Sequence, residues 1–590
     1  MSDDERTVSG GAKALSIALA LLAPARMTWI VFTFGENNLS NDYVGRVQTV
    51  LSILDGRYDF RNLFSDTFIG SGHSWLAILP IYLFDARFFA WSMDVELGIG
   101  LLLSAAKTLL LWLAVAPTLS ARARWLVLPV LSALAFSVSQ VASFTFGEST
   151  LQMQLPQLGL ALGAYAFARF DRRPNVRCAL VAAGGLLASW SWGGGVMVWP
   201  VFFAALLALG ERNLGRWSVL GLAAASGLSQ YALSAAFGHT LSAIERPGLS
   251  QPLRYVGLIG RPFANGTGFD FAPLRSAIAF GAVGLLLAGV TLAVERHRWR
   301  ARIPAIAVLG WSLLVALQIG FFRKDVAAWY IAPMTAFWLG LAALLAFTPR
   351  PLAAAGFATI AAGLLFSNRT WEDKSFYLSS RAPVSAACLR EWRTAPASCR
   401  KRLFQWGGPD LGEPATLGDF LESHHLSVFG PRRTYLLQGD VPLKRVRREP
   451  ETAPSFFSAD GRTPGDIDDF RRLDLILAPR STVSWRVDLP PNLKSAQFLT
   501  RVHAVPGDET LARGASVSVT AEGSPASLEE RAFLPRETAR PLSVDLSSLA
   551  GKTITLRLSA EETHEGATPL VFEAPRVIVT ADAGQNPDAP

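Results

Sequence analysis

The sequence predicts an α-helical, polytopic membrane bundle followed by a soluble β-rich domain. Half of the 590 residues are hydrophobic, only 17% are charged, and the mean hydropathy is +0.29. The hydrophobic residues stand in long runs, which a soluble core does not need and a membrane span does. These runs stop near Ser367, and the residues that follow are polar, charged and rich in proline, as in a globular domain.

About eleven segments have the length and composition of membrane spans. They are Ala14–Phe34, Val95–Ala116, Trp125–Ser143, Leu151–Ala168, Cys178–Ser191, Val196–Leu209, Val219–Phe237, Leu274–Val294, Ala305–Phe322, Tyr330–Phe347 and Leu352–Ser367. Trp75–Trp91 is also apolar, but Pro80, Asp85 and Arg87 interrupt it. We interpret that segment as re-entrant or interfacial. If it spans the membrane, the number of spans becomes even, and the two ends of the bundle lie on the same side of the membrane.

Charge predicts the orientation of the bundle. Alternate short loops hold thirteen arginines, namely Arg122, Arg124, Arg169, Arg172, Arg173, Arg177, Arg212, Arg216, Arg296, Arg298, Arg300, Arg302 and Arg350, against Asp171, Glu211 and Glu295. Arginine-rich loops stay in the cytoplasm, so the N-terminus is expected there and the C-terminal part outside, as in a bacterial inner membrane. The loop balance of 13 − 3 = +10 exceeds the formal net charge of +8, so the basic composition indicates no nucleic-acid partner.

The pattern predicts three regions: a membrane domain at 1–367, a mixed or helical extracytoplasmic region at 368–480, and a β-sandwich at 481–590. Period-two alternation predicts strands at Val483–Leu489, Ala496–Val502, Ala515–Ala521, Leu542–Leu546, Thr553–Leu558 and Val577–Val579. Cys388 and Cys399 are the two cysteines on the outward side, and we expect a disulfide between them in an oxidising compartment. We expect Cys178, in or near a span, to be unpaired.

Candidate functional residues lie in the loops that are predicted to face outward. The first loop, residues 36–73, contains Asp42 and is followed by valines and leucines at helical spacing. A short helix is therefore expected to lie along the membrane surface with Arg46 on its polar side. Glu148 stands close to the start of a span, where a carboxylate is costly unless it is paired or faces water.

Two further outward features surround the later spans. Arg323 and Lys324 stand at the outer end of one span, and a guanidinium fork beside an ammonium group suits a lipid-linked phosphate or diphosphate. Residues 189–200 form a glycine-rich break with three tryptophans between two short spans. We interpret these tryptophans as interface anchors rather than as a platform for sugars.

Each candidate residue also has a structural alternative. Asp42 follows Ser40 and Asn41 and is suited to cap the next helix. Glu148 is suited to the first turn of a helix, where the helix dipole favours an acid. Arg323 and Lys324 are long enough to reach lipid headgroups without binding a substrate.

Taken together, the acid of the first loop, Glu148, the basic junction from Arg323 to Pro333 and the outward C-terminal domain resemble the integral-membrane glycosyltransferases of the GT-C superfamily, such as the protein O-mannosyltransferases and the arabinosyltransferases. The segment from Val544 to Val579 resembles the closing strands of jelly-roll carbohydrate-binding modules.

This resemblance implies transfer of a sugar from a polyprenyl-phosphate donor to a cell-envelope acceptor, which is a glycan, lipid or protein, with Asp42 as the general base. Arg46, His73 and Tyr330 are candidate substrate contacts. Many relatives have an acidic pair in the first loop where this sequence has Asn41 and Asp42, so the involvement of a divalent metal such as Mg or Mn stays open.

Three other functions fit the same sequence. One is an O-antigen polymerase or ligase that acts on lipid-linked oligosaccharide. Another is a flippase or transporter, in which Asp42 and Glu148 are ion-coupling groups. The third is a non-catalytic assembly protein. A transporter is expected to hold its acids near mid-membrane on broken helices, whereas these acids lie in loops.

Overall fold

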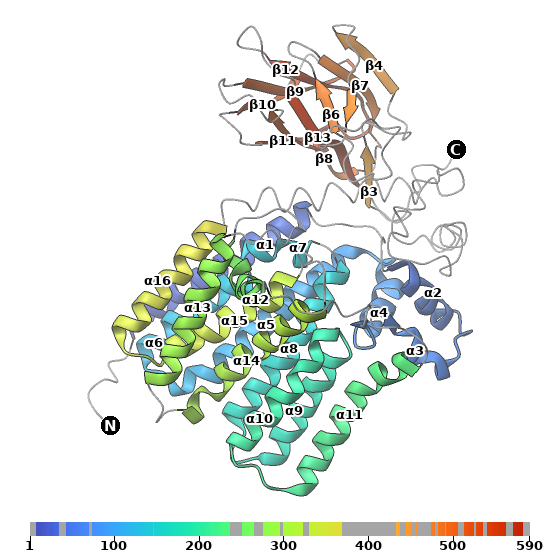
Figure 1. The fold of residues 1–590 in the computed structure, drawn as a ribbon. Helices are drawn as coiled ribbons and strands as arrows, with labels where there is room; N and C mark the ends of the chain where they lie inside the picture. The colour runs from blue at the N-terminus through green and yellow to red at the C-terminus, as the bar shows by residue number, and fades with distance from the viewer. Residues whose placement is uncertain are drawn as a thin grey trace. The chain divides into compact units, whose positions relative to one another are not determined.

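The computed structural model describes residues 8–34, 43–69, 73–145, 147–236, 251–264, 275–294, 299–322, 330–367, 432–436, 444–449, 455–457, 474–477, 482–489, 491, 493–504, 513–523, 527–534, 540–561 and 570–581. The chain divides into two compact units. One contains Met1–Gly35, Ser52–Asp85 and Asp94–Ser375, and the other contains Glu36–Leu51, Ala86–Met93 and Phe376–Pro590. The first unit is helical, and the second contains two large sheets (Figure 1).

The described helices follow the apolar runs of the sequence. They are α1 (Gly10–Phe34), α2 (Tyr43–Leu54), α3 (Leu63–Asp66), α4 (Leu79–Phe89), α5 (Met93–Val115), α6 (Ala121–Ala135), α7 (Val141–Phe144), α8 (Gly147–Arg169), α9 (Pro174–Ser189), α10 (Val198–Ala208), α11 (Leu214–Ala236), α12 (Gln251–Gly260), α13 (Arg275–Val294), α14 (Trp299–Phe322), α15 (Ile331–Leu345) and α16 (Arg350–Ser367). Capping residues and prolines in the sequence explain where some of these helices begin. Ser120 caps α6 by accepting from the N–H of Ala123, and Pro174 occupies the first turn of α9.

Six described segments are long and apolar enough to cross a membrane. They are Gly10–Phe32, Met93–Thr118, Ala121–Phe144, Arg275–Val294, Trp299–Phe321 and Arg350–Ser367. Each coincides with a predicted span. The other five predicted spans are also helical but are shorter or less apolar, as in α9, α10 and α15. The interrupted segment Trp75–Trp91 contains α4, which is not among the six.

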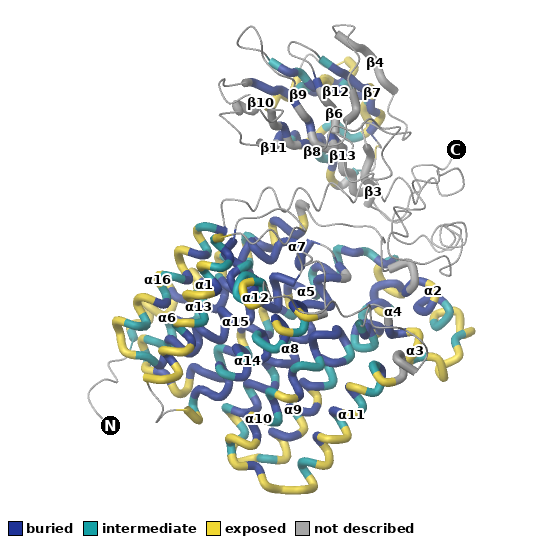
Figure 2. Tube along the Cα trace, viewed as in Figure 1, coloured by how far each residue is buried: buried dark blue, intermediate teal, exposed yellow. Residues whose placement is uncertain are grey.

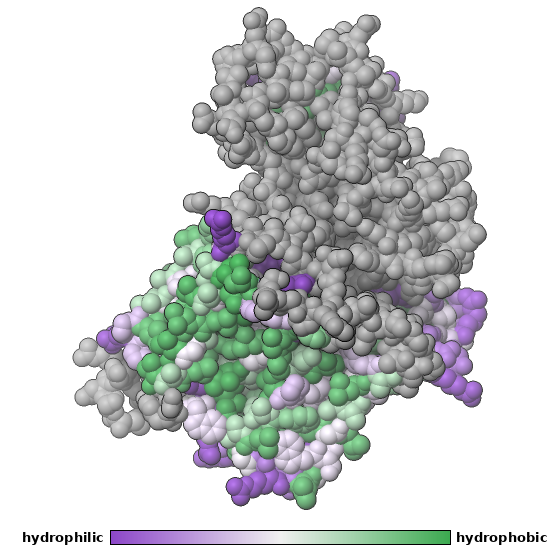
Figure 3. All heavy atoms as spheres, viewed as in Figure 1, coloured by the Kyte–Doolittle hydropathy of each residue, from purple (hydrophilic) through white to green (hydrophobic). Residues whose placement is uncertain are grey.

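The core of the helical unit is α15, in which every residue is buried (Figure 2). Large apolar side chains on the outer helices are exposed, for example Leu102 at 71%, Leu222 at 72% and Leu365 at 70%. Hydrophobic residues dominate the described surface of this unit (Figure 3). A water-soluble protein rarely exposes so much apolar surface, so we interpret this surface as facing lipid.

Two helices approach closely because glycines face each other. A Cβ atom at Gly159 of α8 would lie 2.2 Å from the carbonyl oxygen of Gly184 in α9, and one at Gly184 would lie 2.4 Å from that of Gly159. Only residues without a side chain allow this distance, as is common where helices pack in membranes.

Two of the arginine-rich loops meet at one end of the helical unit. The Arg177 guanidinium donates to Glu211 over 3.0 Å and to Asp171 over 3.2 Å, and Arg216 donates to Glu211 over 2.9 Å. The side chains of Arg177 and Glu211 are 6% and 5% exposed. The loop between α8 and α9 is thus joined to the loop between α10 and α11, as their predicted location on one side of the membrane requires.

Burial raises the pKa of Glu211, but hydrogen bonds from the Asn213 N–H and from Arg177 and Arg216 outweigh burial. The pKa of this carboxyl therefore lies below its ordinary value. Cys178, in α9 beside this network, is a free cysteine, as expected, and its thiol donates to the carbonyl of Arg216.

The C-terminal part contains two antiparallel sheets. Their strands are β3 (Arg432–Leu436), β4 (Lys444–Glu449), β5 (Ser455–Phe457), β6 (Asp474–Leu477), β7 (Thr482–Asp488), β8 (Leu493–Ala504), β9 (Arg513–Ala521), β10 (Ser527–Leu534), β11 (Arg540–Asp545), β12 (Thr553–Glu561) and β13 (Leu570–Ala581). One sheet has the order β10-β9-β12-β7-β4, and the other has the order β11-β8-β13-β6-β5, with β3 also paired to β13. Trp485, Val517 and Leu556 of the first sheet belong to one hydrophobic core with Phe498, Leu542 and Phe572 of the second.

All six predicted strands are present, but the sheets begin earlier in the chain than the alternation predicts. The strands β3 to β6 lie before residue 481, and β10 was also missed. Both β4 and β10 are edge strands of their sheet. The described side chains of β10 are exposed on both faces, so no alternation arises, and charged edges of this kind prevent pairing with other chains.

Replacing Glu211 with alanine should destabilise the helical unit by about 3 kcal/mol at neutral pH, because Arg177 loses its buried carboxylate. The unfolding midpoint in detergent measures this loss. A carboxylate with a lowered pKa contributes stability above its unfolded pKa and loses it as the pH falls through the folded pKa. The difference in stability between wild type and Glu211→Ala should therefore shrink as the pH falls below 4.5, the ordinary pKa of the glutamate carboxyl.

Asp171→Ala is the matched control, because this other partner of Arg177 is 82% exposed. We expect it to cost less than about 1 kcal/mol. Equal losses of stability in Glu211→Ala and Asp171→Ala would contradict the view that burial makes the bond to Glu211 the stronger one.

Candidate functional site

Several predicted site residues lie outside the described residues. These are Asp42, Arg323, Lys324, Cys388 and Cys399. Asp42 stands one residue before α2 begins, and Arg323 and Lys324 follow the end of α14. Glu148 lies in the first turn of α8, which fits the structural alternative, and its side chain is outside the described set. The structure therefore leaves the roles of these residues as predictions.

The structure brings His73 and Tyr330 to the same side chain. His73 lies in a two-residue strand, β2 (His73–Ser74), which pairs with β1 (Phe68–Ile69) in the first loop. Its imidazole stacks on the indole of Trp192, with ring centroids 6.2 Å apart and planes at 21°. Tyr330, just before α15, contacts the same indole at 5.9 Å. These three side chains form what we call the aromatic cluster.

Trp192 belongs to the glycine-rich turn, residues 190–197, which connects α9 to α10. The Trp190 carbonyl accepts from the Ser74 hydroxyl over 3.0 Å and from the Ala77 N–H over 2.8 Å. On the opposite side of the turn, Trp311 of α14 donates to the carbonyl of Gly194 over 3.2 Å. Three distant segments of the chain thus meet at this turn.

Two of the three tryptophans at residues 189–200 do not behave as interface anchors. Trp192 is 2% exposed and Trp199, just beyond the turn, is also 2% exposed. Trp199 donates its indole N–H to the hydroxyl of Ser189 over 2.8 Å. The sequence interpretation of these two side chains was wrong, because composition does not tell an indole at a lipid interface from one inside a bundle.

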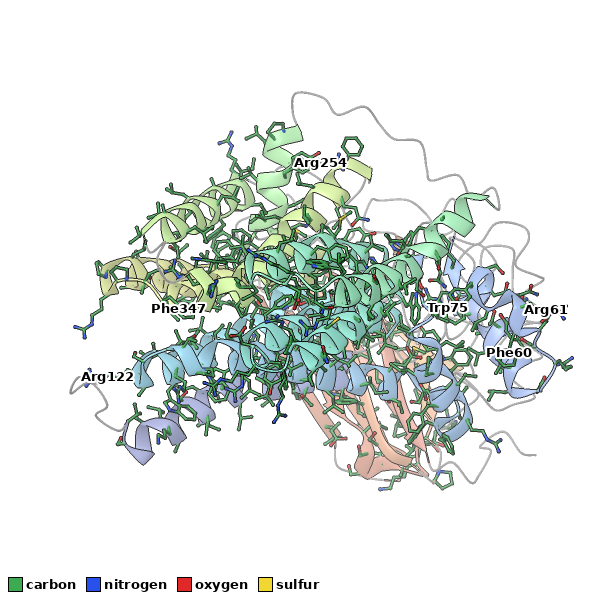
Figure 4. The ribbon with its side chains drawn as sticks, turned by 90° about the horizontal axis from the view of Figure 1, so that it is seen from below. Phe60, Arg61, Trp75, Arg122, Arg254 and Phe347 are labelled. Atoms are coloured by element: carbon green, nitrogen blue, oxygen red, sulfur yellow. The ribbon has the colours of Figure 1, made fainter. Side chains whose placement is uncertain are left out.

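Three other acids of the first loop have structural roles. Asp59 caps a short 3₁₀ turn by accepting from the N–H of Arg61, Asp55 pairs with Arg57, and Asp66 accepts from the hydroxyl of Tyr58. Phe60 is 65% exposed, and with Arg61 it lies at the margin of the helical unit (Figure 4).

The inner part of the first loop is attached to the bundle. The side-chain amide of Gln230 in α11 donates to the hydroxyl of Thr67 over 3.0 Å. Phe64 packs edge-on against Trp190, and Phe68 packs edge-on against Tyr231. The strand that carries His73 is therefore held against the C-terminal ends of α9 and α11.

The expected short helix is present as α2, but its exposed side carries Gln48 and not Arg46. Val47 and Val50 are buried as predicted, and Arg46 is also buried, at 1% exposure. The expectation that Arg46 lies on a solvated face was therefore wrong.

Sequence reasoning missed a buried lysine in α5. Lys107 is 3% exposed, and its ammonium group donates to the side-chain oxygens of Gln154 over 2.6 Å and Gln157 over 2.8 Å, both in α8. A single lysine inside a long apolar run was the available signal, because an ionisable group within a span is costly and marks function by default.

The described residues contain no group of three histidine, cysteine, aspartate or glutamate side chains that could hold a metal ion. This observation does not extend to Asp42, so the divalent metal stays an open expectation.

Replacing Gly195 with alanine should prevent correct folding, because the new Cβ atom would lie 1.8 Å from the backbone oxygen of Ala188. Neither backbone can move away without breaking the turn. Gly221→Ala in α11 is the control, because no atom lies within 4 Å of its Cβ position and alanine favours a helix by about 1 kcal/mol. Yield and unfolding temperature of the two purified variants measure the difference, and similar values would contradict the tight packing of the turn.

Comparison with known proteins gives little further information. No family model matches the sequence, and no curated protein matches it. Among solved structures, the chain is similar to an oligosaccharyltransferase from Archaeoglobus fulgidus crystallised with a tethered acceptor peptide, with 13% identity and a TM-score of 0.38. The match covers 66% of this chain and 58% of that enzyme, so the chain spans less than two thirds of the enzyme's length.

A 4-O-methyl-α-glucuronidase with specificity for decorated arabinogalactans matches at 10% identity and a TM-score of 0.15, over 77% of this chain and 44% of that one. Both similarities are too low to show a shared fold.

Proposed function

We propose that the protein is an integral-membrane glycosyltransferase of GT-C type. It moves a sugar from a polyprenyl-phosphate donor to a cell-envelope acceptor on the extracytoplasmic face. The observation that carries this proposal is the aromatic cluster, where the first loop, the glycine-rich turn and the start of α15 meet. Each of the three segments was expected on the outward side, and two of them hold predicted site residues.

The chain path connects this cluster to the proposed phosphate site. Residues 323–329 join α14 to Tyr330, so Arg323 precedes the cluster by 330 − 323 = 7 residues. Arg323 and Lys324 would stabilise the negative charge that grows on the departing phosphate.

The proposed reaction is a single displacement. Asp42 takes the proton from the acceptor hydroxyl while its oxygen attacks the anomeric carbon. The bond from that carbon to the phosphate oxygen breaks, and polyprenyl phosphate leaves with the electron pair. Attack opposite the leaving group inverts the configuration of the sugar. Glu148 is a second candidate acid, and Arg46, His73 and Tyr330 are candidate substrate contacts.

The remaining parts of the proposal concern architecture. We infer about eleven spans, an outward C-terminal sandwich that binds the glycan or holds the acceptor, and a disulfide between Cys388 and Cys399. The shared core of the two sheets supports the sandwich, and the ion-paired loops at one end of the bundle support the alternation of the spans.

Replacing Asp42 with asparagine should abolish transfer, because an amide cannot accept the hydroxyl proton. We expect a loss of at least about 100-fold, measured by mass spectrometry of envelope glycans from a strain that carries the variant. Asp66→Asn, in the same loop, is the control and should leave the glycans unchanged. A normal glycan profile in an inserted Asp42→Asn protein would refute the proposal.

A transporter of lipid-linked sugar is the second candidate, and the buried Lys107 favours it. Lys107→Met removes the charge and keeps an apolar side chain of similar length. A transferase should keep its glycan product in this variant if the protein remains folded. Accumulation of glycosylated lipid in the inner leaflet, with Asp42→Asn still active, would instead identify a transporter.

A further inference from the structure

The indole N–H of Trp192 has no hydrogen-bond acceptor among the described residues, although the side chain is 2% exposed. A buried donor without a partner is costly and is therefore rare in a native protein. Neighbouring tryptophans show the usual arrangement. Trp199 donates to the hydroxyl of Ser189, and Trp311 donates to the carbonyl of Gly194.

A second unsatisfied atom lies on a neighbouring group. The side-chain amide of Gln318 in α14 donates its N–H to the carbonyl of Gly193 over 3.3 Å, which fixes it beside the residue that follows Trp192. The other end of this amide, the oxygen, is buried and has no donor among the described residues. Trp192 of the glycine-rich turn thus has a spare donor, and the Gln318 amide that bonds this turn has a spare acceptor.

A hydroxyl group satisfies both atoms at once, because it donates one hydrogen bond and accepts others. We propose that Trp192 and Gln318 bind one hydroxyl of the sugar on the polyprenyl-phosphate donor. This inference rests on the proposed function, and it adds the residues that recognise the sugar. The indole N–H donates to the sugar oxygen, and the sugar O–H donates to the Gln318 oxygen.

The neighbours of Trp192 suit this ligand. His73 and Tyr330 contact the indole, and aromatic faces pack against the C–H groups of sugar rings by burial of apolar surface. His73 is only half-buried, so the cluster reaches the surface on this side. Tyr330 directly follows the segment with Arg323 and Lys324, which places the sugar contacts next in the chain to the proposed phosphate contacts.

The first experiment compares the unfolding temperatures of Trp192→Phe and Trp311→Phe in detergent. Both changes remove one indole N–H and a similar volume. Trp311→Phe also leaves the carbonyl of Gly194 without its donor, so it should lower the unfolding temperature more than Trp192→Phe does. An equal or larger loss in Trp192→Phe would show that its N–H already has a structural partner, such as a bound water, and would overturn the inference.

The second experiment measures binding without transfer. Wild type and Trp192→Phe are placed in nanodiscs and titrated with undecaprenyl phosphate, either bare or carrying glucose, mannose or arabinose. Wild type should bind at least one glycosylated lipid more tightly than the bare lipid. Trp192→Phe should weaken that binding about tenfold, as expected for one lost hydrogen bond, and should bind the bare lipid as wild type does. Gln318→Leu should have the same effect.

The outcomes distinguish a failure of this inference from a failure of the proposed function. If the bare lipid binds and no sugar improves the affinity, or if Trp192→Phe keeps the sugar preference, the inference is overturned and the proposed function stands. If no lipid binds wild type and Asp42→Asn also leaves the glycans unchanged, the proposed function falls, and the inference falls with it.

Discussion

The glycine-rich turn depends on hydrogen bonds supplied by other segments. A backbone that leaves the helical conformation among membrane helices has no water to satisfy its carbonyl groups, so protein donors must do so. Ser74 and Ala77 bond the carbonyl of Trp190, and α14 bonds those of Gly193 and Gly194. The turn is therefore stabilised by the segment after the first loop and by α14. Formation of the candidate site is thus coupled to the folding of three parts of the chain that are distant in sequence.

Two buried charged groups of the helical unit are each held by more than one hydrogen-bond partner. The carboxylate of Glu211 is shared between two arginines at the end of the bundle, while the ammonium group of Lys107 is held by two glutamine oxygens within it. A charge in a low-dielectric interior is tolerated when several hydrogen bonds surround it. The indole N–H of Trp192 is one of several buried polar atoms among the described side chains that have no hydrogen-bond partner, together with the amide oxygen of Gln318.

The sequence predicted what depends on composition and periodicity, and missed what depends on tertiary packing. Long apolar runs became helices, and strands with one buried face, such as β7 and β12, were found by alternation. The edge strand β10 was missed because both its faces are solvated. His73 and Tyr330 were selected separately, but no pattern indicated that one indole lies between them. Arg46 and Trp192 were misjudged for the same reason, since burial is decided by parts of the chain far away in sequence.

The complete enclosure of α15 has a consequence for the dependence of the protein on its lipids. With 15 residues, this helix is about 22 Å long, which is shorter than the hydrocarbon layer of about 30 Å. A lipid-facing helix of this length would thin the bilayer around it, but α15 touches only protein, so no such deformation arises. Bilayer thickness therefore acts on the outer helices alone. The position of Tyr330, at the start of α15, is insulated from changes in the acyl-chain length of the host membrane.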